Sequence, residues 1–237
     1  MTSIYTRTIR SVIKAYPAVI PHLTGRARWV AFAAGGEYKT YDYYLQQLTR
    51  LITSVYNGNL GGEFIDIMAN LIQGQIYQAV NQAWLDSGMD GSLPDYLASL
   101  ADDIVLGQYE HVDQLYRDIV DARLDSTPLA PLLARAPLWA TRWTEAYNQA
   151  MLLIAAEMGQ RMVWELGATE QHCETCAALN GIVAFASEWE ELGVMPQSAP
   201  NDALQCGGWK CDCKLTPTEQ RRSPDAYGRI INATVKL

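Results

Sequence analysis

The chain has 237 residues, of which 49% are hydrophobic and 19% charged, and its formal net charge at pH 7 is -8. These proportions are typical of a globular protein with a sizeable core, and they exclude a disordered chain. The longest apolar runs are far shorter than the roughly 18 to 20 residues of a membrane-spanning helix. We therefore expect no transmembrane helix and no membrane partner.

All five cysteines lie in the last third of the chain. The first residues lack the basic start and apolar stretch of a secretory signal, which predicts synthesis in a reducing cytoplasm. A disulfide framework is not expected there, and an odd number of cysteines would leave one thiol over. Metal-bound thiols or free thiols are the remaining options.

Amphipathic helices are predicted over most of residues 1–160. Apolar residues recur at the spacing of one helical face from Tyr41 to Val55, and Asn57-Gly58 ends this first helix. A second helix is predicted from about Phe64 to Trp84. A third begins at Ser92-Leu-Pro-Asp95, where a serine followed three positions later by a carboxylate resembles a capping box, and continues to about Val120.

Three prolines, Pro128, Pro131 and Pro137, are predicted to form a connector before a fourth long helix from about Leu138 to Gly159. Long amphipathic helices joined by short links pack as an elongated bundle. Residues 1–160 are therefore predicted to form a helical bundle, which makes the fold mainly α.

Residues 161–237 are predicted to form a small α+β module that contains all the cysteines. Met162–Leu166 and Ile182–Phe185 are short and rich in β-forming residues, and the segment between them ends in the turn signal Asn180-Gly181. We expect a β-hairpin that carries a cysteine knuckle. A short helix is expected around Ser187–Leu192, followed by a proline-containing loop and a basic tail.

The cysteine spacing indicates a metal centre. Both thiolates of Cys173-x-x-Cys176 can face one ion, and a second pair from Cys206, Cys211 and Cys213 can complete a tetrahedral zinc-knuckle-like shell. The metal would brace a terminus whose apolar area is small. The alternative is a set of reduced, buried thiols packed as small hydrophobes.

The segment His172-Cys-Glu174 has the His-x-Glu form of zinc nucleobase deaminases, which would make the protein a zinc-dependent enzyme acting on a nucleobase or nucleic acid. Those enzymes place their second cysteine pair as Pro-Cys-x-x-Cys, and this chain has Cys-x4-Cys-x-Cys instead. The deaminase hypothesis is therefore disfavoured. A DNA-binding zinc module on a helical scaffold is a third alternative.

Several residues of the last hundred form a pattern in a fixed order. The pattern comprises Thr144-Glu145-Ala-Tyr-Asn148 in a helix, Trp164, Cys173-x-x-Cys176, Leu179-Asn180-Gly181 and Cys211-x-Cys213-x-Leu215. It resembles the phage head morphogenesis family of minor head proteins, of the phage Mu F type, over roughly residues 138–217. Many members carry a His-Pro pair just before the Cys-x-Cys, where this chain has Cys206-Gly-Gly-Trp209.

The resemblance implies a structural, non-enzymatic protein of a tailed-phage virion. Such a protein lies in the head interior or at the portal vertex, is made in the host cytoplasm, and acts in capsid assembly and in DNA packaging or ejection. Its expected partners are the portal or the major capsid protein, with no small-molecule substrate. The family match favours Cys173, Cys176, Cys211 and Cys213 as ligands of a structural zinc ion, and the spacing allows Cys206 to replace one of the last two.

The distribution of charge gives opposing indications about contact with packaged DNA. The acidic net charge opposes binding of a polyanion, since affinity for phosphate grows with the number of surface cations. The C-terminal end is basic, which leaves room for a weak, salt-sensitive contact, or for a solvated tail. A second basic region near the N-terminus could meet an acidic portal or capsid surface. The basic residues are Arg7, Arg10, Lys14, Arg26 and Arg28 near the N-terminus, and Lys210, Lys214, Arg221, Arg222, Arg229 and Lys236 near the C-terminus.

Overall fold

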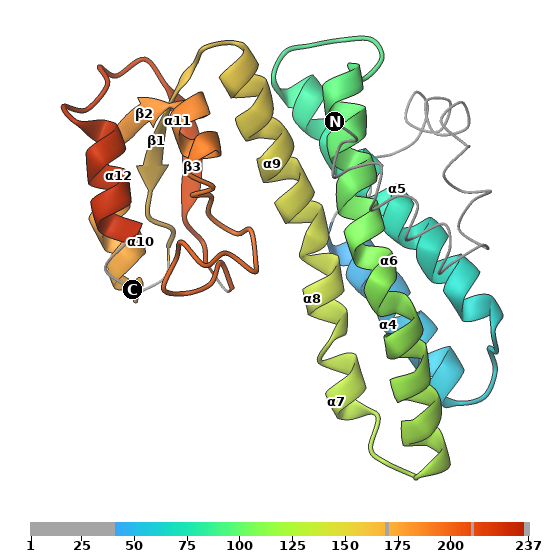
Figure 1. Ribbon diagram of the computed structural model, residues 1–237. Helices are drawn as coiled ribbons and strands as arrows, with labels where there is room; N and C mark the ends of the chain where they lie inside the picture. Colours follow the sequence, from blue (N-terminus) through green and yellow to red (C-terminus); the bar gives the residue numbers. More distant parts are fainter. Residues whose placement is uncertain (1–40, 169–170, 210, 235–237) are drawn as a thin grey trace, which may run out of the picture. The chain divides into compact units, whose positions relative to one another are not determined.

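The computed structural model describes residues 41–168, 171–209 and 211–234 (Figure 1). The basic N-terminal region, Lys210 and Lys236 therefore lie outside the described residues. The described chain divides into two compact units. The first contains residues 41–82 and 91–143, and the second contains residues 83–90 and 144–234. The sequence placed a boundary between residues 160 and 161 instead.

The first unit is a bundle of helices, as the periodicity predicted. Helix α4 (Tyr41–Tyr56) packs against α6 (Asp95–Leu124), α7 (Ala130–Leu133) and α8 (Ala136–Ala140). Most of α5 (Glu63–Asp86) also belongs to this unit. The mainly α fold is thereby confirmed. None of the helices in the described ranges combines the length and the apolarity that crossing a membrane requires.

The predicted helix starts are wrong in two places. The residue that precedes α6 is Pro94, and no side chain caps that end, so the expected capping box does not form. The predicted fourth helix is two helices, α8 and α9 (Arg142–Glu157), with Thr141 between them. Pro131 and Pro137 lie in the first turns of α7 and α8, where a missing N–H leaves no hydrogen bond unmade.

Buried glutamines of α5 connect the helices of this bundle. The hydroxyl of Tyr44 donates to Oε1 of Gln78 at 2.8 Å. The side-chain amide of Gln75 donates to the carbonyls of Trp139 (3.1 Å) and Ala140 (2.7 Å) at the end of α8. The last carbonyls of a helix lack partners within it, so Gln75 satisfies groups that burial would otherwise penalise.

The second unit is built on a three-stranded antiparallel sheet in the order β2-β1-β3. The central strand β1 (Arg161–Glu165) pairs with β2 (Val183–Phe185), which confirms the predicted hairpin. The third strand, β3 (Lys214–Thr218), was not predicted. Its sequence is polar and contains Pro217, a residue that a sheet tolerates on an edge strand such as this one.

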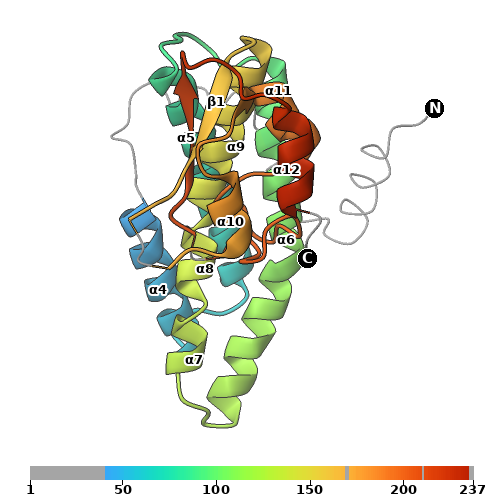
Figure 2. The same cartoon turned by 90° about the vertical axis from the view of Figure 1, so that its left-hand side faces the viewer.

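Three helices accompany this sheet: α10 (Glu174–Leu179), α11 (Ala186–Glu191) and α12 (Ala226–Thr234). Helix α11 confirms the short helix expected around Ser187–Leu192. Helix α12 packs against α10 and β2 (Figure 2). Its residues Ala226 and Ile230 are fully buried, so this part of the chain is not a solvated tail.

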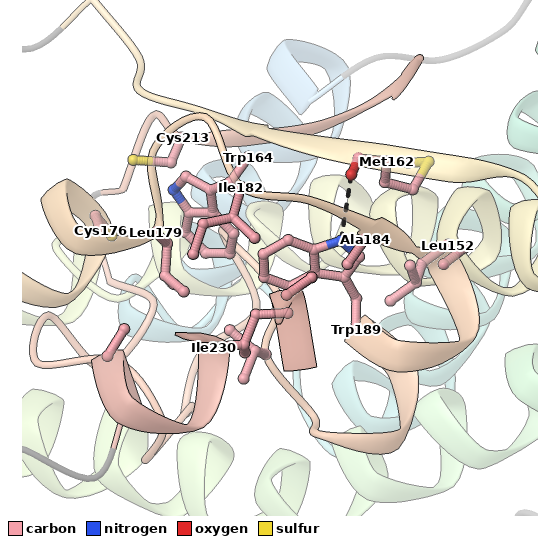
Figure 3. Close-up of a cluster of buried hydrophobic side chains, with 14 of the residues drawn as sticks. Leu152, Met162, Trp164, Cys176, Leu179, Ile182, Ala184, Trp189, Cys213 and Ile230 are labelled. Carbon is pink, nitrogen blue, oxygen red and sulfur yellow. Dashed lines mark hydrogen bonds between the residues drawn. The ribbon is translucent and has the colours of Figure 1, made fainter. Parts of the chain in front are cut away.

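The second unit has a hydrophobic core of its own, centred on two tryptophans (Figure 3). The rings of Trp164 and Trp189 lie 5.7 Å apart between centroids, and neither side chain is exposed. The core also contains Cys176, Cys213 and Leu179. The sequence therefore underestimated the apolar area of this region.

An ion pair fixes the start of α11. Glu188 accepts a hydrogen bond from the Phe185 backbone N–H at 2.9 Å and a two-point bond from the Arg222 guanidinium. The bond from Arg222 is the main reason why the pKa of Glu188 lies below its usual value of 4.5. A carboxyl group with a lowered pKa stabilises the fold fully above the unfolded-state value and loses this effect as the pH falls through the folded-state value.

We expect Arg222→Ala to lower the free energy of unfolding by roughly 1 to 2 kcal/mol at neutral pH, because both partners are partly solvated. The loss shrinks as the pH falls below 4.5 and through the lowered folded-state pKa of Glu188, because protonation of Glu188 removes the ion pair from the wild type. Urea unfolding at a series of pH values measures this difference. Glu219→Gln is the control, since Glu219 pairs with Arg161 but is fully exposed. An equal effect of both substitutions would contradict the prediction.

Candidate metal centre

The structure brings the five cysteines together from three separate segments. Their Sγ atoms form two groups of three, and within each group all sulfurs lie within 4.8 Å of one another. Cys176 belongs to both groups, and its Sγ lies 3.9 Å from that of Cys211. Tetrahedral zinc with Zn–S bonds of about 2.3 Å places its sulfurs about 3.8 Å apart. The groups are Cys173, Cys176 and Cys206, and Cys176, Cys211 and Cys213.

Helix α10 positions the first pair. Cys173 is the N-cap residue of this helix, and its Sγ accepts a hydrogen bond from the Cys176 backbone N–H at 3.4 Å. The Cys-x-x-Cys spacing therefore places Cys176 in the first helical turn, directly above the capping sulfur. Cys176 is 1% exposed, so its thiol points into the core of the unit.

Hydrogen bonds attach the Cys206 segment to α10. The backbone N–H of Glu174 donates to Oε1 of Gln205 at 2.9 Å, and the backbone N–H of Gln205 donates to the hydroxyl of Thr175 at 3.3 Å. Gly208, two residues after Cys206, has a φ of +77° and lies against the Ser198 carbonyl, where a Cβ would come within 2.6 Å of the oxygen. Only glycine fits this turn without strain.

Cys211 and Cys213 lie just before β3, outside the regular strand. Both sulfurs lie within 4.8 Å of the Cys176 sulfur. Gly167, two residues after β1, lies against Asp212, and a Cβ at Gly167 would come within 2.5 Å of the Asp212 carbonyl carbon. The side-chain amide of Gln197 donates to the Cys213 carbonyl at 3.0 Å. A close backbone approach at Gly167 and the side-chain amide of Gln197 therefore hold this cysteine pair.

The electrostatics of the cluster favour one thiolate above the others. A hydrogen bond from Cys176 lowers the pKa of Cys211 to about 5, and the same bond raises the pKa of Cys176. Burial raises the pKa of Cys206 to about 11, which a backbone hydrogen bond from Gly208 opposes. The opposite pKa shifts of this pair favour a Cys211 thiolate that accepts a hydrogen bond from the Cys176 thiol.

One buried donor near the cluster lacks an acceptor. The indole Nε1 of Trp164 is buried and finds no hydrogen-bond partner among the described residues. An unpaired buried N–H group costs about 1 to 3 kcal/mol. An electron-rich thiolate in the cluster would remove this cost.

The chemistry of the donor set fits a metal ion. All the members of the two groups are cysteines, and soft thiolate ligands select thiophilic ions. The cluster could therefore hold such an ion. His172 and Glu174 belong to neither group, and Glu174 is exposed, so the His-plus-two-Cys set of a zinc deaminase is not assembled in these groups.

Sequence reasoning found the five cysteines but missed their supports. Thr175 and Gln205 flank cysteines in the chain, and the hydrogen bonds of Gln205 with Glu174 and Thr175 carried no recognisable signal. Gly167 could have been noticed as a glycine just after a predicted strand, which often marks a close approach of backbone.

Comparison of the chain with protein-family models, with curated proteins and with solved structures gives no match. The interpretation of the site rests on its own geometry.

Proposed function

We propose that the chain is a minor head protein of a tailed phage or prophage, a structural component of the portal vertex that acts in head assembly and in DNA packaging or ejection. One observation carries the proposal. The thiols and apolar residues of the pattern that resembles this family lie in the core of the second unit or pack against it. They are Trp164, Cys173, Cys176, Leu179, Cys211, Cys213 and Leu215.

The polar part of the pattern has a matching structural role. The Asn180 side-chain oxygen accepts from the Leu166 backbone N–H at 3.3 Å, and the Gly181 N–H donates to the Trp164 carbonyl at 2.9 Å. Gly181 has a φ of +74°, which glycine adopts without cost. The Leu-Asn-Gly turn therefore extends the β1–β2 pairing. Residues scattered along the sequence pattern serve one local fold, which supports a shared ancestry with the family.

We propose zinc as the ion and structure as its role. Four cysteine ligands leave no coordination position for a water molecule, whereas catalytic zinc keeps one open. Five thiols within a few ångströms provide four ligands and one in reserve. The ion would hold the loops around Cys206 and Cys211 against α10, as a brace for a surface that contacts another protein.

A protein partner, the portal or the major capsid protein, suits the charge of this chain better than DNA. The net charge is -8, and two of the C-terminal unit's arginines, Arg161 and Arg222, already pair with Glu219 and Glu188. Paired cations contribute little to counterion release, which drives binding to phosphates.

The proposal is tested in cells that encode the chain. Particles are induced, banded by density and analysed by mass spectrometry for the chain, and the same is done after deletion of its gene. We expect the chain in the heads at a few copies and fewer DNA-filled heads without it. DNA-filled, infectious particles that form normally without the chain would contradict the proposal.

The zinc assignment has its own test on the purified chain. Native mass spectrometry under reducing conditions is expected to show one zinc ion per chain, which is lost on denaturation. An absorption spectrum of the cobalt-substituted protein typical of four thiolates supports a structural site. A spectrum that changes when small anions are added would instead indicate an exchangeable position and favour the enzyme alternative.

A further inference from the structure

The strand register places Trp164 and Cys213 on the same face of the sheet. Trp164 of β1 pairs with Leu215 of β3, and Cys213 lies two residues before Leu215. Residues two apart point to the same side, and such diagonal neighbours lie within reach of an aromatic side chain. Both side chains are buried in the same core, at 0% and 1% exposed.

The indole nitrogen of Trp164 faces the cluster. Figure 3 shows it on the side of the ring toward the Cys213 side chain. The equivalent group of Trp189 already donates to the Met162 carbonyl at 3.4 Å, whereas Nε1 of Trp164 has no acceptor among the described residues. Of these two tryptophans, only Trp164 has an indole N–H that can still donate to a cysteine sulfur.

We propose that Cys213 is a ligand of the metal ion and that Trp164 is its positioning residue, donating its indole N–H to the metal-bound Cys213 thiolate. This inference rests on the proposed metal centre. It also selects among the five cysteines, because a thiolate that accepts a buried N–H bond is held in place and is the better ligand. Cys206, which is part-exposed at the other end of the cluster, is then the spare thiol.

The outer partner of a metal ligand typically contributes about 10- to 100-fold to metal affinity. Trp164→Phe keeps the buried ring and removes the donor, so we expect the cobalt affinity to fall by about this factor and the sulfur-to-cobalt charge-transfer bands to shift. Trp189→Phe is the matched control, equally buried and also deprived of an indole donor. It is expected to lower stability while leaving the affinity and the spectrum unchanged.

A second measurement detects the bond itself. In protein loaded with the NMR-active isotope of cadmium, the Trp164 indole proton is expected to show a scalar coupling to the metal through the N–H···S bond, and the Trp189 proton none. In a Cys213→Ser background, where Cys206 supplies the fourth thiolate, Trp164→Phe should cause no further loss.

The outcomes separate the two proposals. Wild-type protein that binds neither cobalt nor cadmium would overturn the metal centre and this inference together. Wild-type binding combined with an unchanged affinity, spectrum and coupling in Trp164→Phe would overturn the inference alone. Persistence of the Trp164→Phe effect in the Cys213→Ser background would likewise overturn it, because Trp164 would then act through another group.

Discussion

Cys176→Ser is expected to weaken metal binding by about 100-fold. Cys176 is the one cysteine common to both sulfur groups, so its loss leaves Cys173 with Cys206 and Cys211 with Cys213 as two separate pairs. Structural zinc sites have apparent binding free energies of roughly 10 to 16 kcal/mol over four ligands. Loss of one ligand therefore costs on the order of 3 kcal/mol, which is about 100-fold in affinity. Isothermal titration or competition with a chromophoric chelator measures this change.

Cys206→Ser is the matched control for that experiment. It removes one thiol but leaves four, including the shared Cys176, so we expect an affinity within about tenfold of wild type. Circular dichroism should show the helices of the first unit retained in both variants, because the cysteines all lie in the second. If Cys206→Ser lowered the metal affinity as much as Cys176→Ser does, Cys176 would have no special role in the site, and the prediction would be wrong.

The helices of the first unit were predictable because burial imposes a period. Tyr44, Leu48, Ile52 and Val55 of α4 are each 1% exposed, and their spacing identifies the buried face without any knowledge of the neighbours. Local ends were less predictable. The cap expected at Ser92 failed because Pro94, with an extended backbone, is the residue directly before α6, and no side chain bonds to that end.

The second unit was less predictable because its elements depend on distant partners. Strand β3 has no apolar alternation, and its position follows from pairing with β1, about fifty residues earlier in the chain. Helix α12 has a basic residue and a glycine, and its buried residues become apparent only against α10 and β2. Charge counting alone made this segment look like a tail.

The cysteine cluster shows the same division. Residue type and spacing identify all five thiols, because a chemistry that needs sulfur leaves few alternatives in the sequence. Which of the five thiols matter most for metal binding depends on the three-dimensional structure. That Cys176 is shared, and that Trp164 faces Cys213, follows from the packing of α10 and from the register of β1 with β3.

Gly167→Ala is expected to damage the metal centre without touching a thiol. The added Cβ would come within 2.5 Å of the Asp212 carbonyl carbon, and Asp212 lies between two of the cysteines. Backbone cannot rotate away as a side chain can, so the two loops must separate. The Gly167 hydrogen bond to the Cys213 sulfur, which opposes the effect of burial on the pKa of that thiol, is stretched in the process.

We expect Gly167→Ala to destabilise the second unit by roughly 1 to 3 kcal/mol, as overpacking does, and to weaken cobalt binding by about 10- to 100-fold. Gly107→Ala is the control, since a Cβ there meets nothing within 4 Å and alanine favours the helix. Thermal unfolding with and without metal distinguishes the two effects. If Gly167→Ala lowered stability but bound cobalt as tightly as wild type, Asp212 would not be the segment that sets the position of Cys211 and Cys213. If Gly167→Ala lowered both the stability and the cobalt affinity, the loop between these cysteines would be held by the chain that follows β1. A deformation of the sheet would then reach the metal through this strand.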